Sequence, residues 1–531
     1  MVAQKKVSPV HVEVHNVGSI GIVQDVPGHE LPPEAWTLGQ NIRFRKNNAE
    51  RMLGHSQIFS TPSVTPSFIF NVPGPSDQSF WLYFSLVAAY AIESGVHTDI
   101  TRAAGAYTAV NGRDWCGTLF GGVQIFTNNA DVPQYWSALS VGTDLIALPN
   151  WNANKRAKIF RAFGSYLFAL NITLSGTNQP HKVLVSHKAD PGSVPSSWDP
   201  TDATVDAIEF ELVDSQGGEL FDGRPLGSVF IAYKKNSTHT IRFIGGSELW
   251  ARDLLFTNSG ILASRCVCEY ANGTRHFVVT QNDIISHAGT KEVEKIAEGK
   301  NKDAIFAEID STNYFNSFCF ENPKYGEVWF AYPTSGFTNP NKAFVYNYVN
   351  KTQTFRDFTG LSAALGVASD GSTETWASTS GTWDTDTAQW STAGRENIVF
   401  ADPGNVKLYK LDDGLAHDAA VPTVILERTG LAVVGRDRQG NPKVAFGVRK
   451  LVTRIWPKCS GAAQWTVQVG AQELREGTVT WSASQLFNPA TMQYLDVTAN
   501  GRFIGVRFQQ QENVAGVIEG YDLRMALLGE H

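Results

Sequence analysis

The chain has 531 residues, a formal net charge of −7 and a pI near 6.0. This charge balance excludes a function built on long-range attraction to nucleic acid, since phosphate binding needs concentrated lysine and arginine. The 31 phenylalanine, 14 tryptophan and 15 tyrosine residues exclude a disordered chain, and five cysteines in a chain of this length exclude a disulfide framework.

The N-terminal segment is rich in turn-forming residues, and we expect an extended arm or a closing strand over residues 1–65. It lacks the apolar core of a signal peptide, so no secretion signal is expected. No run in the chain approaches 18 apolar residues, so no membrane span is expected. His11 and His15 lie in an alternating segment that is typical of a strand, which argues against a helical metal site.

The densest basic patch is IRFRKNNAER (42–51). In a strand, Arg43 and Arg45 share one face, and Lys46 follows them. Two interpretations stay open: a solvated sheet edge guarded by charge, or a contact to phosphate or to a neighbouring protein.

Short strand-like runs follow one another from about residue 80 to residue 411. They are rich in aromatic and β-branched residues, are bounded by turn residues, and often come in pairs. Examples are YLFALNI (166–172), SVFIAYK (228–234), HFVVTQND (276–283), EVWFAYP (327–333) and NIVFADP (397–403). The units span about forty to seventy residues, which predicts a β-propeller of six or seven blades over residues 66–415. Within them, KEVEKIAE (291–298) is compatible with a short helix.

Trp376, Trp383 and Trp390 stand seven residues apart in a stretch of small and polar residues. A coiled coil is excluded because it needs two apolar positions in every heptad and good helix formers between them. We expect three short turns, each held by a tryptophan that packs on a blade edge or on its neighbour. A contact with a neighbouring subunit or another protein, and stacking on a sugar, are the alternatives.

The character of the sequence changes near DDGLAHDAAVP (412–422). Beyond it, strongly alternating segments such as QWTVQVGAQ (464–472) are joined by turns such as GRDRQGN (435–441). This pattern predicts a separate β-sandwich-like domain over residues 416–531. The expected fold class is therefore all-β, a propeller followed by a sandwich.

Most catalytic signatures are absent from the sequence. His29 begins a zincin-like motif, but Pro33 takes the place of the second histidine. There is no G-x-S-x-G elbow, no Walker A loop and no G-x-G-x-x-G. SDGSTETW (369–376) resembles an Asp-box turn with its glycine and tryptophan displaced, so an ordinary turn is preferred.

Acidic residues and cysteines are the remaining candidates for catalysis or metal binding. Acids between Asp206 and Asp214 could form a glycosidase pair only if the fold brought two of them together. Cys266 and Cys268 point to opposite faces of a strand, which predicts buried free thiols and no chelation. We therefore expect no catalytic residue, no cofactor, no metal and no enzyme activity.

Four segments, taken together and in order, resemble the tail nozzle proteins of short-tailed bacteriophages, also called tail tubular or DNA-stabilisation proteins. They are GIVQDVPGHELPPEAWTLGQNIRFRKNNAERMLG (21–54), VFIAYKKNSTHTIRFIGGSELWARDLLFTNSGILA (229–263), HFVVTQNDIISHAGTKEVEKIAEGK (276–300), and YGEVWFAYPTSG followed by KAFVYNYVNKTQTFRDF (325–358). The sequence departs from the family where Gln353–Phe355 replaces the usual tryptophan-containing segment.

The resemblance implies a virion structural protein with a β-propeller and added β-domains. Six copies would form a ring at the distal end of a short tail, enclosing the channel for genome retention and ejection. Expected partners are the chain itself, the tail adaptor above, tail fibres or other tail proteins, and passing double-stranded DNA. The expected location is the virion tail, after assembly from the host cytoplasm. The alternative is a glycan-binding or glycan-cleaving propeller.

Overall fold

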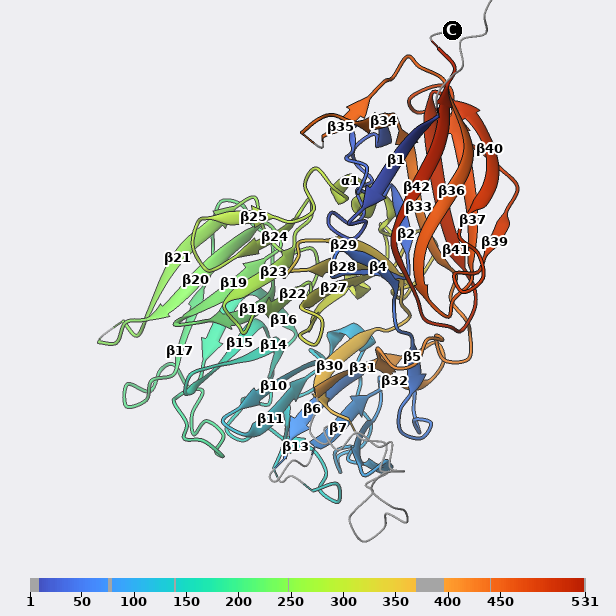
Figure 1. The fold of residues 1–531 in the computed structure, drawn as a ribbon. Helices are drawn as coiled ribbons and strands as arrows, with labels where there is room; N and C mark the ends of the chain where they lie inside the picture. Colours follow the sequence, from blue (N-terminus) through green and yellow to red (C-terminus); the bar gives the residue numbers. More distant parts are fainter. Residues whose placement is uncertain are drawn as a thin grey trace, which may run out of the picture.

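The protein is described by a computed structural model over residues 9–74, 79–137, 140–246, 248–368, 396–439 and 441–529. Two β-domains make up these residues, a propeller and a sandwich (Figure 1). Among them is no helix with the length and apolar character that a membrane crossing requires.

Seven four-stranded antiparallel sheets of the described chain form the blades of the propeller. The first three are β6–β9 (Phe68–Pro73, Ser79–Phe84, Ala89–Glu93, Val96–Asp99), β10–β13 (Cys116–Phe120, Val123–Thr127, Gln134–Trp136, Ile146–Ala147) and β14–β17 (Lys155–Phe163, Tyr166–Leu174, Thr177–Val185, Ile208–Glu211). The next three are β18–β21 (Leu220–Leu226, Val229–Lys234, Ser237–Phe243, Trp250–Thr257), β22–β25 (Val267–Tyr270, Arg275–Val279, Ile284–His287, Val293–Lys295) and β26–β29 (Phe318–Asn322, Glu327–Tyr332, Lys342–Asn347, Gln353–Asp357).

The seventh blade closes the ring with a strand from the N-terminal segment. It consists of β30–β32 (Ser362–Val367, Glu396–Asp402, Lys407–Leu411) and β5 (His55–Gln57), which pairs antiparallel with β32. The first strand of each blade contacts that of the next from β10 round to β6. These first strands therefore line the axis, and the expected six or seven blades are seven.

The propeller core lies between neighbouring blades. Separate clusters of buried side chains fill the spaces between the first and second blades, the third and fourth, and the sixth and seventh. Because both faces of a blade are covered in this way, the inner strands are continuous apolar runs; β27 is buried at every position. This explains why EVWFAYP does not alternate.

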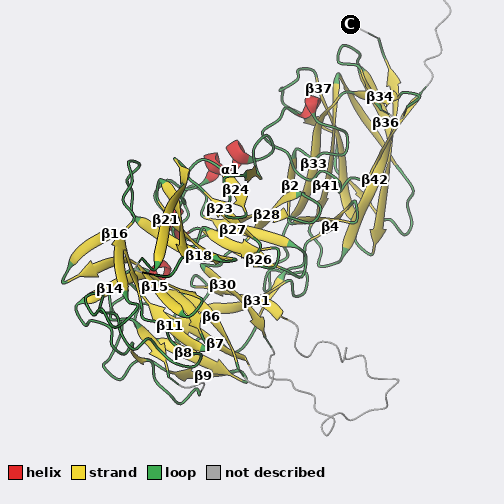
Figure 2. Ribbon diagram, turned by 90° about the vertical axis from the view of Figure 1, so that its left-hand side faces the viewer, coloured by secondary structure: helices red, strands yellow, loops and turns green. Residues whose placement is uncertain are grey.

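The sandwich has two six-stranded sheets (Figure 2). One contains β1 (Val10–His15), β3 (Ile42–Arg45), β4 (Asn48–Arg51), β36 (Lys450–Gly461), β40 (Leu495–Gly501) and β42 (Gly516–Leu527). The other contains β2 (Leu38–Gln40), β33 (Val424–Leu431), β37 (Trp465–Gln472), β38 (Thr480–Trp481), β39 (Gln485–Phe487) and β41 (Phe503–Gln510). A hairpin of β34 (Val433–Arg436) and β35 (Pro442–Val444) forms a separate two-stranded sheet, and β34 packs against β1.

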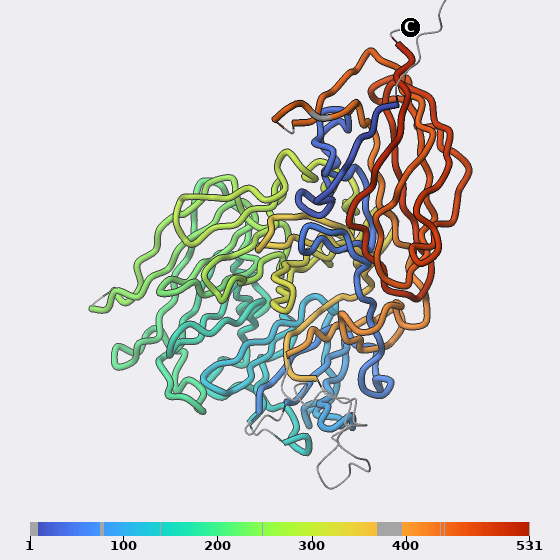
Figure 3. The backbone as a smooth tube through the Cα atoms, viewed as in Figure 1, coloured from blue at the N-terminus to red at the C-terminus, as the bar shows by residue number. Residues whose placement is uncertain are grey.

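The N-terminal segment, expected as an arm or a closing strand, divides between the two domains. Strands β1–β4 complete the sandwich, where β1 pairs with β42 along its whole length, and β5 joins the propeller. Figure 3 shows the N-terminal part of the chain running beside the C-terminal strands. The sandwich is therefore larger than the expected 416–531 and is built from both parts of the chain.

The helical content is small. In the described residues it consists of α1 (Lys302–Glu308) and single turns at Gly28–Glu30, Gly112–Asp114 and Tyr314–Asn316. The short helix considered for residues 291–298 is wrong: Val293–Lys295 forms β25, paired with β24. Strand pairing at the edge of the blade outweighs the helix propensity of this lysine- and glutamate-rich segment.

Candidate functional site

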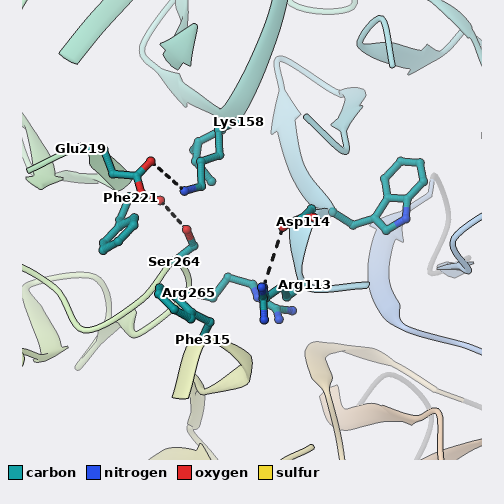
Figure 4. Close-up of a pocket in the computed structure, with 10 residues that line it drawn as sticks. Arg113, Asp114, Lys158, Glu219, Phe221, Ser264, Arg265 and Phe315 are labelled. Carbon is teal, nitrogen blue, oxygen red and sulfur yellow. Dashed lines mark hydrogen bonds and ion pairs between the residues drawn. The ribbon is translucent and has the colours of Figure 1, made fainter. Parts of the chain in front are cut away.

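A cavity of about 220 Å³ lies where the first strands of five blades begin. We call it the axial pocket. Its lining residues are Arg113, Asp114, Trp115, Lys158, Ile159, Glu219, Phe221, Ser264, Arg265 and Phe315. They come from β14 and β18 or from the turns that lead into β10, β18, β22 and β26 (Figure 4). The propeller thus brings together side chains that are spread over some two hundred residues of sequence.

The pocket wall carries three cationic and two acidic side chains. The Lys158 ammonium donates to Glu219 over 3.3 Å and lies 4.7 Å from the centre of the Phe221 ring. Arg113 donates to the Asn316 side chain over 3.1 Å, while the nearest Asp114 oxygen is 4.0 Å from its Nε. The quadrupole of an aromatic ring stabilises a cation above it but does not cancel the charge. The pocket wall therefore keeps part of its positive charge.

Arg265 differs from the other two cations in its backbone and its partners. Its φ is 70°, in the left-handed region, which costs a residue with a Cβ about 1–2 kcal/mol. The Asp222 carboxylate accepts its backbone N–H over 3.2 Å, and its carbonyl accepts from the Cys319 N–H over 2.8 Å. These two bonds hold the turn that directs Arg265 to the pocket.

The guanidinium of Arg265 is only partly satisfied. Nη1 donates to the Leu361 carbonyl over 3.2 Å, whereas Nε and Nη2 are buried and have no hydrogen-bond partner among the described residues. Burial lowers the pKa of Arg265 to about 10, against the opposing effect of nearby Cys266 and Asp114. The charge therefore persists at neutral pH.

A second arginine lies behind the pocket and is fully paired. Arg161 is buried and donates to Asp222 over 3.1 Å and to the Gly223 carbonyl over 3.0 Å. Burial opposes its charge, but Asp222 and Cys116 raise its pKa above the ordinary value. Asp222 thus stabilises Arg161 and positions the Arg265 turn at once.

The lining residues offer no nucleophile with an adjacent base. They include no histidine and no cysteine, and the Ser264 hydroxyl donates to the Phe221 carbonyl over 2.9 Å. No group of three metal-ligating side chains gathers anywhere in the described ranges. The chemistry available in the axial pocket is charge recognition.

The basic patch expected to meet phosphate or a neighbouring protein is placed differently. Arg43 is 2% exposed and donates to Glu327 over 2.7 Å and 3.0 Å and to Asp412 over 3.0 Å. Its guanidinium carbon lies 3.7 Å from the centre of the Tyr325 ring. Both interpretations are wrong for Arg43, because the sandwich strand β3 packs against the sixth blade and covers it.

Arg45 and Lys46 remain exposed at the end of the same hairpin. Lys46 and Asn47 have φ values of 51° and 62°, as a tight turn between β3 and β4 requires. The solvated interpretation fits these two positions, and a contact to another protein there stays a prediction.

The remaining candidates from the sequence are the acids near Asp214, two cysteines and three tryptophans. Asp214 is bound by Lys234, Ser237 and His239, each within 2.8 Å, which makes it a structural carboxylate and not half of a glycosidase pair. Cys266 and Cys268 are buried free thiols, as predicted. Trp376, Trp383 and Trp390, and the Asp-box-like turn before them, lie outside the described residues, so their role stays a prediction.

Sequence reasoning missed the axial pocket. The available signal is weak: a basic residue stands just before the first strand in GRDW (112–115) and again in SRC (264–266). Nothing in the sequence says that these turns face one another, because that depends on the order of blades around the axis.

No protein-family model matches the chain, and no curated protein sequence matches it. Among solved structures it is similar to a Bacteroides fragilis protein assigned as a 6-phosphogluconolactonase, with 11% identity over 72% of this chain and 95% of that chain and a TM-score of 0.36. It is also similar to the WD40 β-propeller domain of Doa1, with 9% identity over 68% and 96% of the two chains and a TM-score of 0.38. At these values neither similarity bears on function.

Proposed function

We propose that the chain is the subunit of a homohexameric nozzle at the distal end of a short bacteriophage tail. In this role it is a virion structural protein that encloses the channel for genome retention and ejection. The proposal starts from four ordered segments that resemble tail nozzle proteins.

The observation that supports it most is where those segments lie. The opening segment (21–54) contains β2, β3 and β4, and the segment at 325–358 contains β27–β29. They meet at the junction of the two domains: the Thr354 hydroxyl donates to the Ile42 carbonyl over 2.6 Å, and Arg43 is paired with Glu327. Two of the four resembling segments therefore pack against each other at one structural junction, as a shared two-domain architecture would require.

The propeller axis does not supply the DNA channel in this proposal. The axial pocket, with a volume of about 220 Å³, has room for one small group. A DNA duplex does not fit there, because its major groove alone is about 12 Å wide. The DNA would therefore run along the axis of the ring, between copies of the chain. With a formal charge of −7, each subunit offers little net attraction to hold passing phosphates.

The partners follow from this placement. The chain would contact its own copies, the adaptor above the nozzle, tail fibres or other tail proteins, and DNA without sequence recognition. It would act in the virion tail after synthesis in the host cytoplasm. No catalytic step is assigned to it.

The second candidate is a glycan-binding or glycan-cleaving propeller. The observation that favours it is the pocket at the propeller axis, where small ligands can enter a ring of first strands. Its weakness is that the two lining carboxylates, Asp114 and Glu219, each lie beside a cation, and that a cavity of about 220 Å³ has room for one small group but not for a sugar chain.

Cryo-electron microscopy of the virion that carries this chain tests the proposal. We expect six copies in a ring at the end of a short tail, with the purified protein inactive on surface polysaccharide. A monomer that is absent from particles, or that binds or cleaves polysaccharide, would overturn the nozzle and favour the second candidate. Ring formation is scored in the particle, because docking on the adaptor can precede it.

A further inference from the structure

Arg265 lines the axial pocket and has hydrogen-bond donors that lack acceptors. Two of its three guanidinium nitrogens are buried without a partner, and it forms no ion pair with any described residue. Leaving buried charged donors unpaired costs free energy that a bound acceptor recovers. The left-handed backbone at Arg265, held by Asp222 and Cys319, adds strain that the surrounding strands must maintain.

The other two cations of the pocket wall can bind the same kind of acceptor as Arg265. Arg113 and Lys158 line the same cavity, and their side chains are about one third and one fifth exposed, at 30% and 21%. Both can therefore turn toward a ligand without unfolding the blades. With two carboxylates against three cations, the pocket has a net positive charge inside an otherwise acidic protein.

We propose that the axial pocket binds a small oxyanion, a phosphate or a carboxylate group, through Arg265, Arg113 and Lys158. Arginine is suited to this because its planar fork of N–H donors matches two oxygens of one anion. The cavity volume of about 220 Å³ is below that of ordinary ligand pockets, about 300–1,000 Å³. The ligand is thus a single small group, not a glycan chain, and the site is independent of the nozzle proposal.

Two sources can supply this chemistry: a free phosphate ion, or a carboxylate from a small organic acid or a partner's acidic side chain. Titration calorimetry on the full chain, with inorganic phosphate and with malonate at constant ionic strength, distinguishes them. We expect saturable binding of one anion per chain, together with a rise in thermal unfolding temperature. If only malonate binds, the carboxylate is the ligand class; if only phosphate binds, it is the phosphate.

Removing a cation and removing a carboxylate from the pocket should change anion binding in opposite directions. Lys158→Gln and Arg113→Gln should each weaken binding about tenfold by removing a charged donor. Glu219→Gln should tighten it several-fold, because it removes the carboxylate that competes for Lys158 over 3.3 Å. Arg265→Gln should abolish binding, and circular dichroism is needed to show that this variant still folds.

The matched controls lie on the outer strands β16 and β17 of the third blade and do not line the pocket. Lys182 pairs with Glu209 over 3.2 Å, with exposures close to those of Lys158 and Glu219. Lys182→Gln and Glu209→Gln should change the dissociation constant less than twofold. Absence of saturable binding in the wild-type protein, or equal effects of the pocket and control substitutions, would overturn the site.

Discussion

Arg43 and Arg45 stand two residues apart on β3 and have opposite environments. Arg43 lies under the sandwich against Glu327 and Asp412, while Arg45 is exposed. The pKa of Glu327 is raised by burial, which Arg43 counteracts. A charge whose partner is removed in such a site stays buried and uncompensated.

Arg43→Met should therefore lower the free energy of unfolding by about 3–5 kcal/mol. Arg45→Met, the matched control from the same hairpin, should change it by about 0.5 kcal/mol or less. Urea denaturation followed by tryptophan fluorescence measures both. Equal midpoints for the two variants would show that the buried pair does not stabilise the junction.

Two buried histidines form a hydrogen-bonded chain between the fourth and fifth blades. The Gly289 N–H donates to His287 Nδ1 over 3.1 Å, so His287 Nε2–H donates to the Tyr233 hydroxyl over 2.8 Å. Tyr233 in turn donates to His276 Nδ1 over 2.7 Å, and His276 Nε2–H donates to the Pro225 carbonyl over 2.9 Å. This order of donors and acceptors requires both imidazoles to be neutral.

Stability should consequently fall with acidification. Burial lowers the pKa of His276 to about 3, with His287 adding to the effect, and burial followed by Arg275 lowers the pKa of His287 to about 4. The unfolded chain takes up protons on both side chains below pH about 6.5, and the folded chain does not. The stabilisation is complete above pH 6.5 and is lost as the pH falls toward the folded-state values.

The test is the slope of unfolding free energy against pH between about 4.5 and 6.5. His287→Gln keeps a side-chain donor for Tyr233 and should reduce that slope by about 1.4 kcal/mol per pH unit. His11→Gln, on the exposed face of β1, should leave the slope as in the wild-type protein. An unchanged slope in His287→Gln would contradict the neutral chain.

At the scale of elements, the closure of the propeller depends on one short strand. β5 pairs with β32 through residues 55–57, and Gly54 directly precedes it. The Gly54 N–H donates to the Gly414 carbonyl over 2.8 Å. A Cβ at Gly54 would overlap the backbone carbonyl of Ala416, and backbone cannot move away as a flexible side chain can.

Gly54→Ala should destabilise the seventh blade by about 1–3 kcal/mol or more. Gly142→Ala is the control, because its new Cβ would meet nothing within 4 Å and its φ is not positive. Hydrogen exchange should show faster exchange in β5 and β32 for the first variant alone. Uniformly slow exchange there in Gly54→Ala would mean that closure does not depend on this contact.

At the scale of the whole molecule, the two domains share one hydrophobic core. The largest cluster of buried side chains runs from sandwich strands such as β41 into blades five and six, with Trp36 and Phe44 of the N-terminal segment between them. The sandwich is thus completed, and joined to the propeller, by residues that precede the propeller in sequence.

A chain that begins at residue 66 loses β1–β5, and with them four sandwich strands and the closing strand. We expect it to aggregate or to unfold without cooperativity, because two sheets then expose buried faces and unpaired edges. The full chain, measured alongside it, should unfold cooperatively. Thermal unfolding with light scattering distinguishes them, and a soluble, cooperative chain from residue 66 would refute the shared core.

The sequence by itself determined the all-β class, the propeller with a sandwich after it, strands such as EVWFAYP and the buried thiols Cys266 and Cys268. These follow from local signals: side-chain periodicity, turn residues and β-propensity act within a few residues of chain. Arg43 and the axial pocket, in contrast, were decided by tertiary structure alone. A side chain's burial and its neighbours depend on which strands meet in space, and here residue 43 meets 327 and 113 shares a cavity with 265.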